Sequence, residues 1–186
     1  KARKKRGRCF TYRVILWCLI MAIPTANTST FQARLEQHGN IAELLFEAFM
    51  MQYCHKRITR VGQEAWLPGW VHGKLRFNYN QDAELIKHFP DYDCGKSLVQ
   101  VKDAPSESGY PSVTIERASY NVAVRFVSLG IPVYVVWLFQ DRKSFYGQRA
   151  DLINPIQSKG DNGSGTPMSI VYKSQLRPLL DFYRDL

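Results

Sequence analysis

The sequence predicts an α/β domain in which a mixed central sheet is flanked by helices. Residues 131–139 are almost wholly apolar and β-branched, which is typical of a strand buried on both faces. Apolar side chains from Ile115 to Leu129 recur on one helical stripe, and Gly130 follows at a C-terminal cap position. A third segment, residues 98–102, has the alternation of a strand. The order strand, helix, strand predicts a crossover between parallel strands.

Composition is that of a folded, basic protein. The 186 residues suffice for one domain with a sizeable core. Hydrophobic residues make up 45% and charged residues 22%, which excludes wholesale disorder. The net charge of +9 favours a polyanionic partner, nucleic acid first and an anionic membrane surface second. Six positive charges lie between Lys1 and Arg8, so the remaining chain is only mildly basic.

Residues 1–30 differ from the rest of the chain. A basic run is followed by the apolar residues 14–23 and then by Pro24 and small residues, in the order of a secretory signal. The apolar run is too short for a comfortable membrane span. We predict an N-terminal extension over residues 1–30 and a single domain over residues 31–186.

Three interpretations of this extension stay open. In the first, the extension is a basic arm that is solvated or binds phosphate. In the second, the native chain starts at Met21 and residues 1–20 lie outside the fold. In the third, residues 1–27 are a true secretory signal. In the last case the protein is a secreted or membrane-associated structural domain.

The four cysteines give no sign of a metal site. Cys9, Cys18, Cys54 and Cys94 form no CxxC pair and no cluster with histidine at ligand spacing, so zinc is not expected. A reduced intracellular setting is the simpler interpretation, and we expect a cytoplasmic protein.

Helical spacing begins at Thr30, with a break and restart at Gly39 and Asn40. After the restart Glu43 and Glu47 lie four residues apart and share a face. Glu43 is a candidate for a metal site, but Asn40 as N-cap and Glu43 at the third helical position also fit a capping box.

Residues 58–80 are predicted to form strands and turns. Residues 66–70 have the composition of a tight turn, and Leu75, Phe77 and Tyr79 alternate with polar residues. The cations Lys74 and Arg76 lie among aromatic residues and suit contacts with a nucleic-acid backbone. The alternative is the solvated face of a hairpin.

Turn residues and periodicity predict the remaining elements and connections. A short helix is expected over residues 81–88, loops over residues 103–111 and 158–167, a strand end and loop over residues 141–155, a last strand over residues 168–172, and a terminal helix capped by Ser174.

The most informative polar pattern lies in residues 89–102. Asp91 follows Pro90, a turn comes next, and the strand that follows carries Gln100 and Lys102 two residues apart. Side chains alternate along a strand, so Gln100 and Lys102 share one face. If Asp91 lies beside them, its carboxylate and the amide suit Mg²⁺, and the lysine can orient a water and stabilise negative charge. One alternative is an edge strand whose lysine reaches to solvent. Another is that a nearby acid takes the place of Asp91: Asp82, Glu84 or Asp93.

This pattern resembles the PD-(D/E)xK nuclease superfamily. Pro90 and Asp91 stand for the "PD", and Gln100, Val101 and Lys102 stand for the "(D/E)xK". An acid is usual where this chain has Gln100, although the Mrr-like branch is similar in carrying glutamine there. The segment from Gly39 to Glu43 resembles the first helix of many members, and the resemblance covers residues 39–139.

The resemblance implies a restriction endonuclease-like core and metal-dependent hydrolysis of phosphodiesters, with DNA as substrate. Asp91 would bind Mg²⁺ (or Mn²⁺), supported by Glu43 directly or through water, and Gln100 and the Val101 carbonyl would complete the coordination. Lys102 would position the attacking water. No small-molecule cofactor is expected.

Cations outside the motif are candidates for DNA phosphates: Lys74, Arg76, Lys96 and Arg117. Glu116 and Tyr120 lie beside Arg117 on the polar side of the crossover helix, where they either contact substrate or form a solvated face. The sequence leaves a homodimer open. It also leaves open an inactive nucleic-acid-binding module in which Gln100 records the loss of a ligand.

Overall fold

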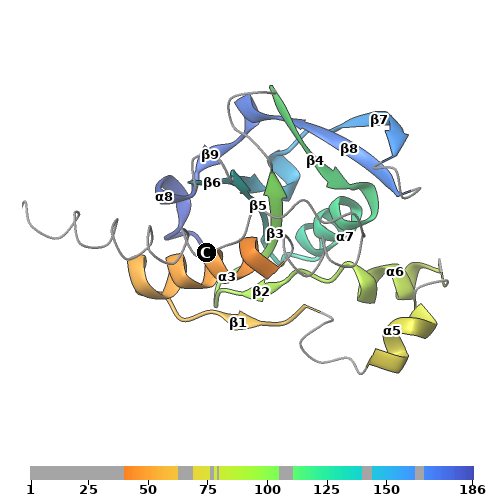
Figure 1. The fold of residues 1–186 in the computed structure, drawn as a ribbon, viewed down its shortest axis with the longest axis horizontal. Helices are drawn as coiled ribbons and strands as arrows, with labels where there is room; N and C mark the ends of the chain where they lie inside the picture. Colours follow the sequence, from red (N-terminus) through yellow and green to blue (C-terminus); the bar gives the residue numbers. More distant parts are fainter. Residues whose placement is uncertain are drawn as a thin grey trace, which may run out of the picture. The chain divides into compact units, whose positions relative to one another are not determined.

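The computed structural model describes residues 40–62, 69–75, 78, 80–104, 111–139, 144–161 and 166–186. All of these belong to the compact unit His38–Leu186. The extension predicted over residues 1–30 and the cation Arg76 lie outside the described residues. Two sheets and several helices make up the unit (Figure 1). No described helix is both long and apolar enough to cross a bilayer.

The larger sheet has six strands in the order β1-β2-β3-β5-β6-β9. Strands β3 and β5 are parallel, and the other neighbouring pairs are antiparallel. The sheet is therefore mixed, as predicted. Its strands are β1 Thr59–Arg60, β2 Tyr92–Asp93, β3 Leu98–Ala104, β5 Val133–Phe139, β6 Ser144–Arg149 and β9 Arg177–Pro178.

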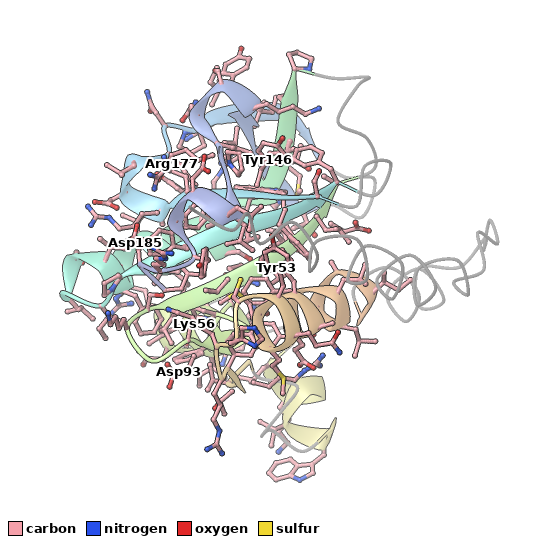
Figure 2. The ribbon with its side chains drawn as sticks, turned by 90° about the vertical axis from the view of Figure 1, so that its left-hand side faces the viewer. Tyr53, Lys56, Asp93, Tyr146, Arg177 and Asp185 are labelled. Atoms are coloured by element: carbon pink, nitrogen blue, oxygen red, sulfur yellow. The ribbon has the colours of Figure 1, made fainter. Side chains whose placement is uncertain are left out.

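Helices cover the two faces of this sheet, as Figure 1 shows. On one face Val99 and Val101 pack in a core with Phe46 of α3 (Asn40–Ala48) and with α8 (Leu179–Phe182). On the other face Val135 and Trp137 pack against α7 (Arg117–Ser128). Every residue of β5 is buried, which confirms the doubly covered central strand. Side chains fill both sides of the sheet in the turned view of Figure 2.

A second, antiparallel sheet has the order β4-β8-β7. Its strands are β4 Ser112–Glu116, β8 Pro167–Tyr172 and β7 Ile156–Asp161. Strand β8 confirms the predicted last apolar strand, although the short β9 follows it. The loop predicted over residues 158–167 is wrong over residues 158–161, which belong to β7. Pairing with β8 supplies backbone hydrogen bonds that composition alone does not reveal.

The crossover helix starts later than predicted. Ile115 lies in β4, where Val113 and Ile115 are buried and Thr114 is exposed, so the local period is two. Leu129, predicted to lie on the apolar stripe, follows α7 and is 69% exposed. Gly130 has φ +83°, which confirms its place at the end of the helix.

The prediction of strands and turns over residues 58–80 is wrong for residues 69–75. These residues form α5 (Gly69–Leu75). Lys74 Nζ lies 5.9 Å from the centre of the Trp70 ring, a contact that the four-residue spacing of a helix allows. The helix expected over residues 81–88 is confirmed as α6 (Gln81–Lys87), where the Asn80 side chain accepts a hydrogen bond from Ala83 N at 2.7 Å.

Two further predictions near the C-terminus are wrong. Residues 144–149, expected within a strand end and loop, form all of β6, which pairs with β5 and is followed by the 3₁₀ turn Ala150–Leu152. Ser174 caps no helix and lies in the 3₁₀ turn Lys173–Gln175. Helix α8 begins after Pro178, whose fixed φ suits a helix start. Helix α3 ends in the π-turn Phe49–Tyr53.

Candidate active site

Asp91 and Gln100 meet on neighbouring strands. Tyr92 of β2 pairs with Val99 of β3, which sets the preceding Asp91 beside Gln100. Asp91 Oδ2 accepts two hydrogen bonds, one from Gln100 Nε2 and one from the Val101 backbone N–H, each at 2.7 Å. The structure thus brings together the acid and the amide of the predicted motif.

The backbone explains why the Asp91 side chain takes this position. Asp91 N donates to the Val99 carbonyl at 2.9 Å, the last such bond before Pro90, which has no N–H. The next donor on β3, Val101 N–H, is satisfied by the Asp91 carboxylate instead. At this point β2 and β3 are held together by a side chain, so the acid is fixed where the strand pairing ends.

The two residues that follow β1 hold the main chain of Asp91 from the other side. The N–H groups of Val61 and Gly62 both donate to the Asp91 carbonyl, at 2.9 and 3.1 Å. A Cβ on Gly62 would lie 3.3 Å from Asp91 Cα and 3.6 Å from Oδ1, so glycine allows this close approach. Backbone contacts from these two residues and from β3 therefore pre-organise Asp91.

Lys102 lies two residues beyond Gln100 on β3, on the face opposite the Val99 and Val101 core. Its side chain is 23% exposed, and Nζ lies 3.5 Å from Glu116 Oε2 at the end of β4. The predicted catalytic lysine therefore has a carboxylate partner that comes from the second sheet.

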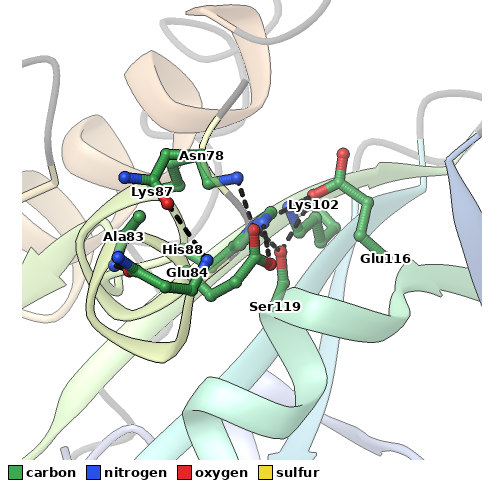
Figure 3. A network of polar contacts seen from close by, with 9 residues as sticks. Asn78, Ala83, Glu84, Lys87, His88, Lys102, Glu116 and Ser119 are labelled. Carbon is green, nitrogen blue, oxygen red and sulfur yellow. Dashed lines mark hydrogen bonds and ion pairs between the residues drawn. The ribbon is translucent and has the colours of Figure 1, made fainter. Parts of the chain in front are cut away.

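Glu116 belongs to a chain of polar contacts (Figure 3). Ser119 Oγ in α7 donates to Glu116 Oε2 at 2.9 Å and lies 3.0 Å from His88 Nδ1. His88 Nε2 lies 3.4 Å from Glu84 Oε2, and Glu84 also pairs with Lys87. The contacts join α6, β3, β4 and α7 around one half-buried cluster.

The charges in this cluster shift two pKa values. The Lys102 ammonium holds the pKa of Glu116 below its usual range, in opposition to burial, and the Ser119 hydrogen bond and His88 act in the same direction as the lysine. Burial lowers the pKa of His88, although Glu116 and Glu84 oppose the shift. At neutral pH Glu116 is thus an anion beside Lys102.

Glu43, the fourth predicted site residue, forms an ion pair with Arg60 at 3.1 Å. Arg60 also pairs with Glu47, which accepts a hydrogen bond from the Tyr92 hydroxyl at 3.0 Å. Tyr92 packs in the core under α3, on the face of the sheet opposite Gln100. Glu43 thus lies in an acidic cluster around Arg60, and its metal role stays a prediction.

The predicted phosphate-binding cations lie on separate elements. Lys74 is exposed on α5, and Lys96 is exposed in the turn before β3, where its N–H donates to the Leu186 carbonyl at 3.1 Å. Arg117 begins α7, and its Nε is buried without a hydrogen-bond partner among the described residues. The Tyr120 hydroxyl donates to the Ile153 carbonyl at 2.9 Å, which is a structural contact.

Sequence reasoning missed His88 and Ser119 as neighbours of the site. His88 was only the end of a predicted helix, and Ser119 was one of several polar residues on the crossover helix. The three-residue spacing of Glu116 and Ser119 was a usable signal, because residues so spaced are neighbours at a helix start. The contact of this pair with His88 depends on the tertiary fold.

The oxygen atoms that Asp91, Gln100 and Val101 carry are of the kind that binds a hard cation such as Mg²⁺. One carboxylate, one amide and the backbone of Val101 gather at Asp91, and Mg²⁺ is commonly held by one or two carboxylates together with waters and substrate phosphates. Within the described ranges no group of three His, Cys, Asp or Glu side chains is arranged to hold a metal.

Comparison with known proteins found two similar solved structures. The first is a nuclease from a fusselovirus, with a TM-score of 0.45, 10% identity, and coverage of 86% of this chain and 94% of that one. The second is a Holliday junction resolvase from the archaeal hyperthermophile Archaeoglobus fulgidus, with a TM-score of 0.40, 12% identity, and coverage of 71% and 86%. No protein-family model and no curated protein matches the chain.

Proposed function

We propose that the protein is a divalent-metal-dependent nuclease that hydrolyses phosphodiesters in DNA. The observation that carries the proposal is the meeting of the Asp91 carboxylate with the Gln100 amide and the Val101 N–H at 2.7 Å each. Lys102 follows on the same face of β3 as Gln100. The acid, amide and lysine of the motif therefore occupy two adjoining strands.

Asp91, the Gln100 amide oxygen and the Val101 carbonyl would hold Mg²⁺ or Mn²⁺. In a strand the N–H and C=O of one residue point to the same neighbour, so the Val101 carbonyl faces the edge where its N–H meets Asp91. A half-turn of the Gln100 amide exchanges its nitrogen and oxygen. Glu43 would add support directly or through water. When bound, the metal stabilises charge on the phosphate and activates water.

The chain's own groups orient the reaction and balance its charge. Backbone contacts from β3 and from the two residues after β1 hold Asp91, so this residue needs little reorganisation on binding, while the Gln100 amide turns over. The Lys102 ammonium orients the attacking water and stabilises the negative charge that develops on the phosphate. No small-molecule cofactor takes part.

DNA suits the charge of the chain. The net charge of +9 attracts a polyanion, and Lys74, Arg76, Lys96 and Arg117 are the proposed phosphate contacts. A homodimer would let two sites act on the two strands of DNA. Dimer formation is a separate proposal, which a measurement of the protein's molar mass in solution tests.

A second function is an inactive nucleic-acid-binding module. One observation favours it: Gln100 donates to Asp91, and Lys102 pairs with Glu116, so both groups have partners in the protein itself. The two functions differ in metal-dependent cleavage and agree in DNA binding.

A cleavage assay distinguishes the nuclease from the inactive binding module. Labelled linear, single-stranded and four-way branched DNA are each incubated with the protein in Mg²⁺, Mn²⁺ or EDTA. We expect cleavage with metal and none with EDTA. Asp91→Asn keeps the shape of the side chain and removes its charge, so it should lower the rate about 100-fold or more. Asp181→Asn, an exposed change on α8, is the matched control. If folded wild-type protein binds DNA and cleaves none of these substrates with either metal, the binding module is the correct function.

A further inference from the structure

Glu116 lies outside the predicted motif, yet it contacts the lysine of that motif. We propose that Glu116 is a positioning residue for Lys102, held in place by Ser119 and His88. This inference rests on the proposed function, because Lys102 acts on the substrate and Glu116 acts through Lys102. The proposal gives a function to the cluster of Glu116, Ser119 and His88, which lies outside the motif.

The geometry sets Glu116 behind the lysine. Lys102 Nζ and Ser119 Oγ both approach the same oxygen of Glu116, Oε2, at 3.5 and 2.9 Å. His88 Nδ1 lies 3.8 Å from that oxygen. One carboxylate oxygen is therefore shared by a cation, a hydroxyl and an imidazole that come from three different elements (Figure 3).

Burial makes these contacts matter more than surface pairs. Ser119 is 2% exposed, and the side chains of His88, Lys102 and Glu116 are 19%, 23% and 35% exposed. Attraction between charges is stronger where water is partly excluded. A long lysine side chain loses rotamer freedom when it is held, so a fixed anion is needed to keep its ammonium in one place.

The hydrogen-bond directions also exclude a different role for the cluster. A histidine, a serine and two glutamates suggest nucleophilic catalysis. Ser119 Oγ donates its only proton to Glu116 and is almost fully buried, so it accepts from His88 and is closed to an incoming substrate. The cluster is arranged to hold Glu116, not to attack a bond.

The first measurement needs no enzymatic activity. Amine labelling by limited acetylation, read by mass spectrometry, compares Lys102 with Lys56 in the same sample. The reagent must reach the amine, and the contact with Glu116 Oε2 at 3.5 Å holds the Lys102 amine in its half-buried position. In Glu116→Gln, which keeps the shape and the Ser119 contact, Lys102 should react about fivefold faster, while Lys56 is unchanged.

The second measurement is steady-state cleavage. Glu116→Gln should lower kcat about 10-fold or more. KM for DNA and the Mg²⁺ dependence should change less than about twofold, because a residue that acts only through Lys102 touches neither ligand. Glu116→Asp should recover part of the loss, since it restores the charge. Asp181→Asn is the control. Thermal unfolding first shows whether each variant is folded. If Glu116→Gln does not fold, the second variant is Ser119→Ala, which keeps the charges of both Lys102 and Glu116.

The outcomes separate this inference from the function on which it rests. Wild-type protein without metal-dependent cleavage ends the proposed function, and the positioning role ends with it. Wild-type cleavage with unchanged Lys102 labelling in Glu116→Gln overturns the inference alone. The inference is also overturned if Glu116→Gln raises only KM or weakens only metal binding, since Glu116 would then be a ligand-binding residue. Faster Lys102 labelling together with a kcat loss that Glu116→Asp partly restores supports it.

Discussion

At the scale of single residues, Gln100 is the most unusual feature of the site. Its amide donates to Asp91 at 2.7 Å, so in the absence of metal the pair is a neutral donor bound to an anion. An acid at the same place would set two carboxylates against each other. Compared with an acid at position 100, glutamine therefore stabilises the metal-free protein and offers less negative charge to a bound cation.

Gln100→Glu tests this at pH 8. In EDTA the variant loses a hydrogen bond to a charged group and gains repulsion, so its free energy of unfolding should fall by about 2 kcal/mol. The melting temperature should drop by roughly 4–8 °C. Mg²⁺ should raise the melting temperature of Gln100→Glu more than that of wild type, because two carboxylates bind the cation more strongly.

Gln157→Glu, an exposed change on β7, is the control. Equal responses of both variants and the wild type to Mg²⁺ would count against a cation at Asp91 and Gln100.

His88 gives the fold a pH dependence. Burial lowers its pKa below the ordinary value, in spite of Glu116 and Glu84. The unfolded chain then binds the proton more readily than the folded protein, so stability is full above about pH 6.5 and falls as the pH drops through the folded-state pKa of His88. Lys87 and Lys102 are the nearby cations that favour the neutral ring.

Melting temperatures between pH 7.5 and 5.5 check this expectation. We expect the wild-type melting temperature to fall over this range and the fall to be smaller in His88→Gln. His55→Asn, a change at an exposed histidine, is the control. A fall of the same size in His88→Gln would show that other groups carry the pH dependence.

At the scale of helices and strands, long apolar runs were predicted well and short strands were not. Strand β5 is recognisable from its unbroken apolar run, and helix α7 contains enough residues to show a helical period by itself. Strand β4 has five residues and runs directly into α7, so Ile115 fitted the stripe of the helix that follows. Its strand form is stabilised by pairing with β8, more than fifty residues later in the chain, which local patterns do not report.

Strand β6 depends on a glycine for its packing. A Cβ on Gly147 would lie 2.5 Å from the Val135 carbonyl oxygen and 3.0 Å from a methyl group of Val136. The nearer atom belongs to the backbone of the fully buried β5, so it cannot move aside cheaply.

Gly147→Ala should therefore lower the free energy of unfolding by about 1–3 kcal/mol or more, measured by denaturant titration. Ser144→Ala, on the same strand, adds no atom and removes a hydroxyl that is buried without a hydrogen-bond partner among the described residues, so it should be neutral. A neutral Gly147→Ala would contradict the packing of β6 on β5.

At the scale of the whole molecule, the motif was predicted and its surroundings were not. Asp91 and Gln100 are nine residues apart, and one turn between antiparallel strands brings them together, so local reasoning sufficed. Lys102, Glu116 and His88 meet only after β4 joins the second sheet and α6 packs beside α7. The order of the chain does not show such contacts.

Lys102 belongs to the sequence motif and also contacts the cluster around Glu116. It shares a face of β3 with Gln100 and pairs with Glu116 of β4. The central claim is that this ammonium assists metal-dependent hydrolysis of DNA. A lysine with only a structural role would affect stability and leave the chemical step unchanged.

Single-turnover cleavage of a labelled DNA substrate in Mg²⁺ tests this claim most directly. It compares wild type with Lys102→Ala, and Lys56→Ala is the control, with all three proteins confirmed to be folded and to bind the DNA. We expect wild type and Lys56→Ala to cleave at similar rates, EDTA to stop both, and Lys102→Ala to be at least about 100-fold slower. Equal rates for Lys102→Ala and wild type, or no Mg²⁺-dependent cleavage by wild type, would contradict it.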